Sequence, residues 1–209
     1  KKYYDKKLKG RGTVIFNPLF TEGLPEVYSG ERKKQIVTAG RLHNKKNQKM
    51  LISAFAKVSE KHPEYELVIY GEGPLRAELE AQVKELGLDG KVQLPGNVSD
   101  LCEHTKDSAM FVMPSDFEGM PNALIEAMAI GLPCISTDCP CGGPRELIEN
   151  KVNGVLVPVG DVDAMANAIN ELLETEELAK RMGKNAQEIR SRLDCDSIGE
   201  QWLKYLADL

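Results

Sequence analysis

Short apolar runs and helical patterns alternate along most of the chain, and this alternation restricts the fold more than any other feature. The runs lie at 13–17, 35–40, 66–71, 91–96, 110–115, 132–137 and 154–159. Amphipathic patterns at 47–62 and 74–87 separate the second, third and fourth runs. Nearly continuous apolar strands that alternate with helices are typical of a parallel sheet covered on both faces. We therefore predict one doubly wound α/β domain over residues 1–209, ending in two or three helices after residue 160.

The charge balance restricts the partners that the chain can take. It has 27 Lys and Arg against 32 Asp and Glu, a net charge of −5, and nucleic-acid-binding domains are usually basic, so we expect no nucleic-acid partner. Residues 1–11 are the exception, with six basic residues. They are either a solvated tail or a segment that touches a membrane surface or an acidic partner.

No apolar run reaches the roughly 18 residues of a membrane span, and we recognise no signal peptide. We expect a cytoplasmic protein, and a peripheral position on the inner face of a membrane stays open.

Five cysteines make an odd count without a layout typical of disulfides; they are Cys102, Cys134, Cys139, Cys141 and Cys195. Cys139 and Cys141 are too close together for the usual zinc pair, and no His lies nearby to complete a site. We therefore expect reduced thiols and no metal site.

In doubly wound sheets ligands bind beyond the carboxyl ends of the strands, so the strand-to-helix loops are the first places to search for function. The loop GRLHNKKN (40–47) places Arg41, His43, Lys45 and Lys46 together in an acidic protein. Arginine can bind a phosphate through two parallel hydrogen bonds, and lysine can add a point charge. The alternative is a solvated basic loop.

Two glycine-containing loops are less informative. YGEGPLR (70–76) has two glycines of a dinucleotide fingerprint but Arg76 near the place of the third, and it follows the third strand rather than opening a βαβ unit. This argues against a nicotinamide enzyme and favours a tight turn. In STDCPCGGPREL (136–147), Gly142 and Gly143 permit either close approach to a ligand or a plain turn before a helix. The sequence does not decide between the two.

The stretch SDFEGMPNALIEAMAIGLPCIS (115–136) is the strongest candidate for a site. A helix beginning at Pro121 would have Met120 as its N-cap, and Met120 has no side-chain oxygen for the free amides of the first turn. These amides belong to Asn122, Ala123 and Leu124. Free amides at a helix N-terminus bind anions, so a diphosphate is the expected guest.

Two acids flank this helix start. Glu126 lies one turn into the helix on the face of Asn122, and a carboxylate there can accept two hydrogen bonds from a vicinal diol such as a ribose. Glu118 precedes the turn, and we expect it to point into the same crevice, toward the hydroxyls of a polyol. Taken singly, Glu126 is as readily a solvent-facing acid, and Glu118 part of an acidic loop. The uncapped helix start between them favours a ligand site.

Several segments occur in the order and approximate spacing of a known family: GRLHNKKNQKMLISAF, LVIYGEGPLR, VQLPGNVSDL, PSDFEGMPNALIEAMAIGLPCIST, GGPRELI and NGVLVPVGD. Over residues 30 to 175 the chain resembles the group-1 (family 4) glycosyltransferases, which are retaining enzymes of the two-domain GT-B architecture. The block EGMPNALIE, with two acids eight residues apart, is the most specific part of the resemblance. It implies a Rossmann-like sheet that forms one half of a GT-B fold, namely the carboxyl-terminal, donor-binding half.

The resemblance also implies roles for individual residues. Arg41 and Lys46 match the basic pair that holds the donor diphosphate and stabilises the leaving charge. Glu118 matches the acid that contacts the donor hexose, Glu126 the acid that binds the ribose hydroxyls, and Val98 the position that contacts the base. The implied catalytic residues are thus Arg41, Lys46 and Glu118. The implied donor-binding set is completed by Gly40, Gly119, Met120, Pro121, Asn122, Ala123 and Leu124. Many members have Gly-Phe-Gly where this chain has Gly119-Met120-Pro121. Pro121 has no N–H, so it cannot supply the backbone amide contact to the donor that the resemblance implies there.

The implied reaction is the transfer of a hexosyl unit from a nucleoside diphosphate sugar, most commonly a UDP-sugar, with retention and without metal or cofactor. An amino-terminal domain that this sequence does not contain would hold the acceptor, and a lipid-linked acceptor at a membrane is compatible with this interpretation. Residues 1–30 resemble a remnant of the interdomain segment, and residues 194–209 resemble the helix that crosses back. Alone, the chain would turn over poorly or not at all. Two alternatives stay open: a GT-B nucleotide-sugar epimerase, which would release free UDP without an acceptor, and a non-catalytic nucleotide-binding module.

Overall fold

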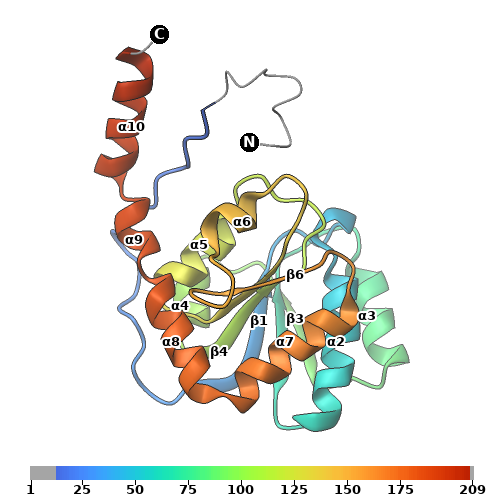
Figure 1. Cartoon of the computed structure of the whole chain (residues 1–209). Coiled ribbons are helices and arrows are strands. Elements are labelled where there is room, and N and C mark those ends of the chain that lie inside the picture. Colours follow the sequence, from blue (N-terminus) through green and yellow to red (C-terminus); the bar gives the residue numbers. More distant parts are fainter. Residues whose placement is uncertain (1–12, 208–209) are drawn as a thin grey trace.

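Six parallel strands form the sheet that organises the described chain, residues 13–207 of a computed structural model (Figure 1). The strands are β1 (Lys33–Ala39), β2 (Glu66–Tyr70), β3 (Val92–Gly96), β4 (Ser108–Met113), β5 (Cys134–Thr137) and β6 (Val155–Val157). They pair in the order β3-β2-β1-β4-β5-β6, with every neighbouring pair parallel. The predicted doubly wound, Rossmann-like sheet is confirmed. The basic segment 1–11 and its predicted partners lie outside the described residues.

Alternate residues of the strands enter two separate apolar cores, one on each face of the sheet. Ile36 and Ile69 belong to the first core, whereas Val37 and Val68 belong to the second. Because successive side chains of a strand point to opposite faces, a strand can supply both cores only if it is apolar throughout. This accounts for the continuous apolar runs in the sequence.

Helices cover both faces. They are η1 (Asn44–Lys46, a 3-10 turn), α2 (Gln48–Lys61), α3 (Arg76–Glu85), α4 (Leu101–Thr105), α5 (Asn122–Ala129), α6 (Gly143–Leu147), α7 (Val162–Glu174), α8 (Glu176–Ala186), α9 (Ile189–Arg192) and α10 (Cys195–Ala207). Helices α2, α3 and α7 bury their apolar sides in the first core, and α4, α5, α6 and α9 in the second. The predicted helices at 47–62 and 74–87 correspond to α2 and α3. Within the described residues four helices follow residue 160 rather than two or three, because the stretch that ends at Leu193 is divided at Thr175 and again at Gln187 and Glu188.

The predicted strand at 13–17 is wrong. Residues 13–25 form an extended segment without a strand, which we call the strap, and it runs along the helices of the second core (Figure 1). Its backbone is held by a helix end, since the Leu19 amide donates to the Leu193 carbonyl at 2.7 Å. Leu19 is buried, and the ring of Phe16 lies under the Arg192 guanidinium. Leu19 and Phe16 of the strap are therefore held by packing on helices instead of by pairing in the sheet.

Helix α10 extends away from the sheet (Figure 1). Of its residues only Ile198 is buried, while Trp202, Leu203 and Leu206 are 49%, 70% and 59% exposed. The last helix thus has an exposed apolar face. None of the helices in the described range is both long and apolar enough to cross a membrane.

Strand order reverses between β1 and β4, which lie side by side at the centre of the sheet. The chain moves outward from β1 through β2 to β3, and then returns across the sheet to begin β4. In open α/β sheets this switch point is where ligands bind. The loops that follow β1 and β4 are therefore the parts of the fold to examine for a site.

Candidate functional site

The loops after β1 and β4 are joined by direct hydrogen bonds. The Asp116 amide donates to the Lys45 carbonyl at 2.8 Å, and the Asn47 side-chain amide donates to an Asp116 carboxylate oxygen at 2.7 Å. Asn47 adopts a left-handed conformation with φ 45°, and its side-chain oxygen also caps α2. One asparagine thus fixes the start of α2 and the distance between the two loops.

Lys46 and Glu118 form an ion pair across the switch point, with 2.5 Å between Nζ and Oε1. The same Oε1 accepts a hydrogen bond of 2.7 Å from the Ser115 hydroxyl. Only 9% of the Glu118 side chain is exposed, against 32% of the Lys46 side chain. Because a buried carboxylate is costly without partners, this pair and the serine hold Glu118 in one position. We had expected Glu118 in one crevice with Glu126, but its Oε1 is already occupied by Lys46 and Ser115.

The loop YGEGPLR supports the basic loop from beneath. A Cβ atom added at Gly71 would lie 2.1 Å from the Gly40 carbonyl oxygen, and one at Gly73 would lie 2.4 Å from the Leu42 carbonyl oxygen. The Leu42 amide donates to the Glu72 carbonyl at 2.9 Å. These glycines are therefore explained by close packing of two backbones, in agreement with the tight turn that the sequence favoured.

The loop CPCGGP supports the Glu118 loop in the same way. A Cβ atom at Gly143 would lie 2.3 Å from the Gly119 carbonyl oxygen. The Cys141 sulfur lies 2.5 Å from the Glu118 carbonyl oxygen and 3.1 Å from the Glu118 amide. Gly142, with φ 85°, makes the turn itself. The question that the sequence left open is answered for Gly143, which is required by close backbone approach.

Helix α5 begins one residue later than predicted. Pro121 is its N-cap, Asn122 is its first residue, and no side chain caps it. The Pro121 carbonyl accepts hydrogen bonds from Leu124 and Ile125 at 3.0 and 3.1 Å, as the carbonyl of an N-cap does. The Leu124 amide is therefore not free. Within residues 13–207, the amides of Asn122 and Ala123 are the first-turn donors left for a ligand.

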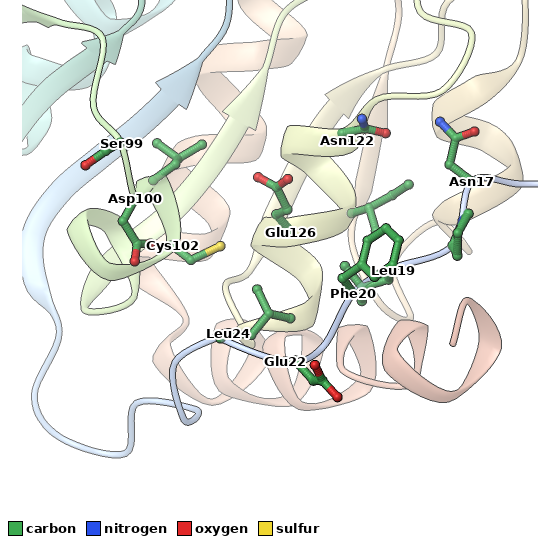
Figure 2. A pocket seen from close by; sticks show the side chains of 14 residues that line it. Asn17, Leu19, Phe20, Glu22, Leu24, Ser99, Asp100, Cys102, Asn122 and Glu126 are labelled. Carbon is green, nitrogen blue, oxygen red and sulfur yellow. The ribbon is translucent and has the colours of Figure 1, made fainter. Parts of the chain in front are cut away.

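Glu126 lies in a cleft of about 560 Å³ (Figure 2). The strap forms one wall, residues 99–102 form another, and Asn122, Ile125 and Glu126 of α5 lie between them. The Glu126 side chain is half-buried, and its carboxylate accepts no hydrogen bond from the described residues. Burial, with a smaller contribution from the nearby Asp100 carboxylate, raises the pKa of Glu126 above its usual value. A half-buried carboxylate without a donor from the described residues can accept hydrogen bonds from a ligand.

The cleft and the basic loop have opposite charge. Three acids line the cleft, namely Glu22, Asp100 and Glu126, and among residues 13–207 no Lys, Arg or His lines it. Cys102 also lines it, and burial raises the pKa of this thiol to about 12, so the thiol is neutral. The cleft therefore suits hydroxyl and N–H donors and repels phosphate groups.

The remaining predicted residues lie around these two features. Arg41 is exposed, and its guanidinium has no hydrogen bond or ion pair within the described chain, although its carbonyl accepts from Gln48. The Lys46 side chain lies next to the backbone at Gly40. Met120, Ala123 and Val98 are partly buried against the second core, and Gly119 is exposed at the start of the turn.

The structure also brings in residues that the sequence did not indicate. Ser115 and Cys141 hold the side chain and backbone of Glu118, and Asp116 with Asn47 ties the two loops together. Ser115 and Asp116 lie three and two residues before Glu118 in the sequence, so their position was a signal that could have been used. The strap had no such signal, because its place beside Glu126 depends on the helices at the other end of the chain.

Comparison with known proteins identifies the family. A sequence profile described as "Glycosyl transferases group 1" matches residues 24–189. An exopolysaccharide phosphotransferase of Streptomyces coelicolor is 36% identical over 177 residues, which are 84% of this chain and 19% of that protein. The GalNAc-alpha-(1->4)-GalNAc-alpha-(1->3)-diNAcBac-PP-undecaprenol alpha-1,4-N-acetyl-D-galactosaminyltransferase of Campylobacter jejuni is 31% identical over 211 residues, covering 100% of this chain and 58% of its own length.

Among solved structures, S. aureus TarM in complex with fondaparinux, alpha-GlcNAc-glycerol and UDP is similar with a TM-score of 0.85 and 26% identity, over 92% of this chain and 38% of TarM. The chain thus spans about half the length, or less, of the proteins it matches. Because the family profile matches most of its residues, the chain belongs to the group 1 glycosyl transferases.

Proposed function

We propose that this chain binds the nucleoside diphosphate sugar donor of a retaining hexosyl transfer, with a UDP-sugar as the donor. The observation that carries the proposal is the half-buried Glu126 carboxylate without a hydrogen-bond donor, in an acidic cleft on α5, the helix that follows the loop in which Glu118 pairs with Lys46. UDP is present in the TarM complex, which supports the choice of base.

The charge difference orients the donor. Phosphate groups avoid a cleft lined by Glu22, Asp100 and Glu126, so the diphosphate lies outside it, against the free amides of α5 and the side chains of Arg41 and Lys46. The uncharged nucleoside then enters the cleft. There the ribose diol donates two hydrogen bonds to Glu126, and the base reaches toward Val98.

The catalytic roles follow from this orientation. Arg41 and Lys46 stabilise the negative charge that develops on the leaving diphosphate, and no metal or cofactor is needed for this step in our proposal. Glu118 binds hexose hydroxyls through its second oxygen, Oε2, while Ser115 and Lys46 hold Oε1. Lys46 has three N–H donors, so it can contact the diphosphate without releasing Glu118.

We further propose that a second domain, outside this sequence, holds the acceptor. The exposed face of α10, together with residues 1–30, would connect the two domains, so the chain alone would have little or no transferase activity. The name of the Campylobacter jejuni relative includes PP-undecaprenol. By analogy we propose a lipid-linked acceptor at the inner face of a membrane, with the protein otherwise cytoplasmic.

Calorimetric titration of the chain with UDP, GDP, ADP and their sugar conjugates tests the donor site. We expect selective binding of UDP and its conjugates, and a loss of roughly 1.5–3 kcal/mol of binding free energy in both Glu126→Ala and Arg41→Ala, because each removes a charged hydrogen-bonding group. Arg181 is a matched control for Arg41, since it is exposed, lies on α8 and has no ion pair in the described chain. Arg181→Ala should bind as the unchanged protein does.

Three results would contradict the proposal. Selective binding of GDP or ADP would overturn the choice of base. Equal affinity of Glu126→Ala and the unchanged chain would remove Glu126 from the site. Release of UDP from a UDP-sugar by the chain without an acceptor would favour an epimerase.

A further inference from the structure

We propose that the strap is a ligand-binding wall of the nucleoside subsite, with the Phe20 ring packing against the bound nucleoside and binding holding the strap in place. The inference rests on the proposed function and concerns a segment to which the sequence assigned no binding role.

The strap forms about half of the cleft around Glu126. Of the 14 lining residues, those at 17–20 and 22–24 belong to it. Figure 2 shows the Phe20 ring with Leu19 on the strap side of the cleft, and Asn17 near Asn122 at the end of the cleft closer to the start of α5. A ligand that uses Glu126 therefore lies within reach of the strap.

Phe20 is 71% exposed although it lies in the cleft. Leu19 and Leu24 of the strap are mostly buried against the second core. These two side chains can hold the strap on the domain without a contribution from Phe20. An exposed aromatic ring in the same cleft as an acid that lacks a donor forms a site with an apolar face and a polar acceptor. A nucleoside matches this pair, because its ring faces stack on aromatic side chains while its hydroxyls donate hydrogen bonds.

Hydrogen bonds to the rest of the domain hold the strap at both ends of the section that lines the Glu126 cleft. At one side the Leu19 amide bonds to Leu193, and at the other the Pro25 carbonyl accepts from Arg190 at 3.2 Å. Between these anchors the strap has a backbone bond of its own, from Leu24 to Thr21. A bound nucleoside would add contacts to this middle section, so its backbone should exchange hydrogen more slowly in the complex.

The test compares Phe20→Ala with Val14→Ala, since Val14 is an exposed apolar residue of the same strap outside the cleft. We expect Phe20→Ala to weaken UDP binding roughly 5- to 100-fold, the range found for loss of one aromatic–base contact, and Val14→Ala to leave it unchanged. Because Phe20 is largely exposed, its truncation should not lower the Tm, which is measured in parallel.

Comparison of UDP with UMP distinguishes the contribution of the strap to nucleotide binding from that of the basic loop 40–47. Phe20→Ala should weaken both nucleotides by the same factor, because the ring touches the nucleoside that they share. Arg41→Ala should weaken UDP more than UMP. Hydrogen exchange should show protection of residues 20–24 on addition of UDP.

The outcomes distinguish this inference from the proposed function. If Glu126→Ala loses UDP but Phe20→Ala binds it as before and residues 20–24 gain no protection, the strap only packs on the domain and this inference fails, while the donor site stands. If the unchanged chain binds no nucleotide at millimolar concentration, the proposed donor site and this inference both fail.

Discussion

Glu118 and Glu126 are two acids of one segment, eight residues apart, that the fold treats in opposite ways. Glu118 is almost fully buried, paired with Lys46 and bonded to Ser115, and its backbone is clamped by Cys141 and Gly143. Glu126 is half-buried in an open cleft and has no hydrogen-bond donor among the described residues.

The difference shows how one strand-to-helix loop provides both a rigid and an adaptable part. The Glu118 region is stabilised in advance by its own contacts, so its geometry does not depend on a ligand. The Glu126 region keeps a partly desolvated carboxylate without a donor from the described residues, and donors from a ligand would offset this cost. Substitutions in the first region should therefore change stability, and substitutions in the second should change binding.

The largest effect is expected for Lys46→Ala. It leaves the Glu118 carboxylate buried with Ser115 as its remaining partner, and the free energy of unfolding should fall by roughly 3 kcal/mol. Denaturant unfolding measures this change. The double variant Lys46→Ala/Glu118→Gln should recover part of the loss, because no unpaired charge is then buried.

Arg41→Ala is the matched control for this prediction. Arg41 belongs to the same loop, but it is exposed and unpaired in the described chain, so its removal should leave stability unchanged while it weakens nucleotide binding. If Lys46→Ala unfolds at the same denaturant concentration as Arg41→Ala, the ion pair does not hold Glu118 in place, and the distinction between the two regions is lost.

A smaller effect is expected for Gly143→Ala, which pushes a methyl group against the Gly119 carbonyl oxygen at 2.3 Å. The two loops must separate, at a cost of roughly 2 kcal/mol of stability. Gly119→Ala is the control, because a Cβ atom there meets nothing within 4 Å, and it should unfold like the unchanged protein. Equal unfolding midpoints for the two variants would refute the clamp on the Glu118 backbone.

Much of the fold could be predicted because its signals are local. Continuous apolar runs such as 66–71 require burial on both faces, and the amphipathic pattern at 47–62 requires one buried side, so the strands and helices followed from periodicity alone. The run 13–17 has the same composition but is no strand. What decides its structure is a partner distant in the sequence, the end of α9 at Leu193, which periodicity cannot indicate.

The site was predictable in its residue types and less so in its geometry. An acid in an apolar helix and a basic loop after a strand both indicated binding, and the structure places Lys46 beside Glu118. The sequence could not show that Glu118 and Glu126 face different surroundings, because this depends on Ser115, Cys141 and the strap, which meet only in the folded chain. The start of α5 was misplaced by one residue, since proline fits either the N-cap or the first helical position.

A binding effect without loss of stability is expected for Glu126→Gln. Glutamine keeps the size of the side chain but replaces a charged acceptor by a neutral one, so affinity for UDP should fall about tenfold, or roughly 1.4 kcal/mol. Calorimetry measures the affinity and thermal unfolding the stability. The prediction fails if Glu126→Gln binds normally, or if it is as unstable as Lys46→Ala.

The smallest effect concerns the pH dependence of stability. Burial, followed by the Asp100 carboxylate, raises the pKa of Glu126 in the folded chain above its unfolded value. The folded state therefore holds the proton more tightly than the unfolded state, so Glu126 favours folding at low pH, and this advantage is lost as the pH rises from the unfolded pKa through the folded pKa. Glu126→Gln should accordingly have a slightly higher Tm than the unchanged protein at pH 7, and the difference should vanish below about pH 4. Solvent screening of a half-exposed group keeps the effect small. Thermal scans from about pH 3 to pH 8 measure it. A Tm of Glu126→Gln below that of the unchanged protein at pH 7, with the difference vanishing at acid pH, would mean that Glu126 is stabilised as an anion in the folded chain and that the contrast between the two acids is mistaken.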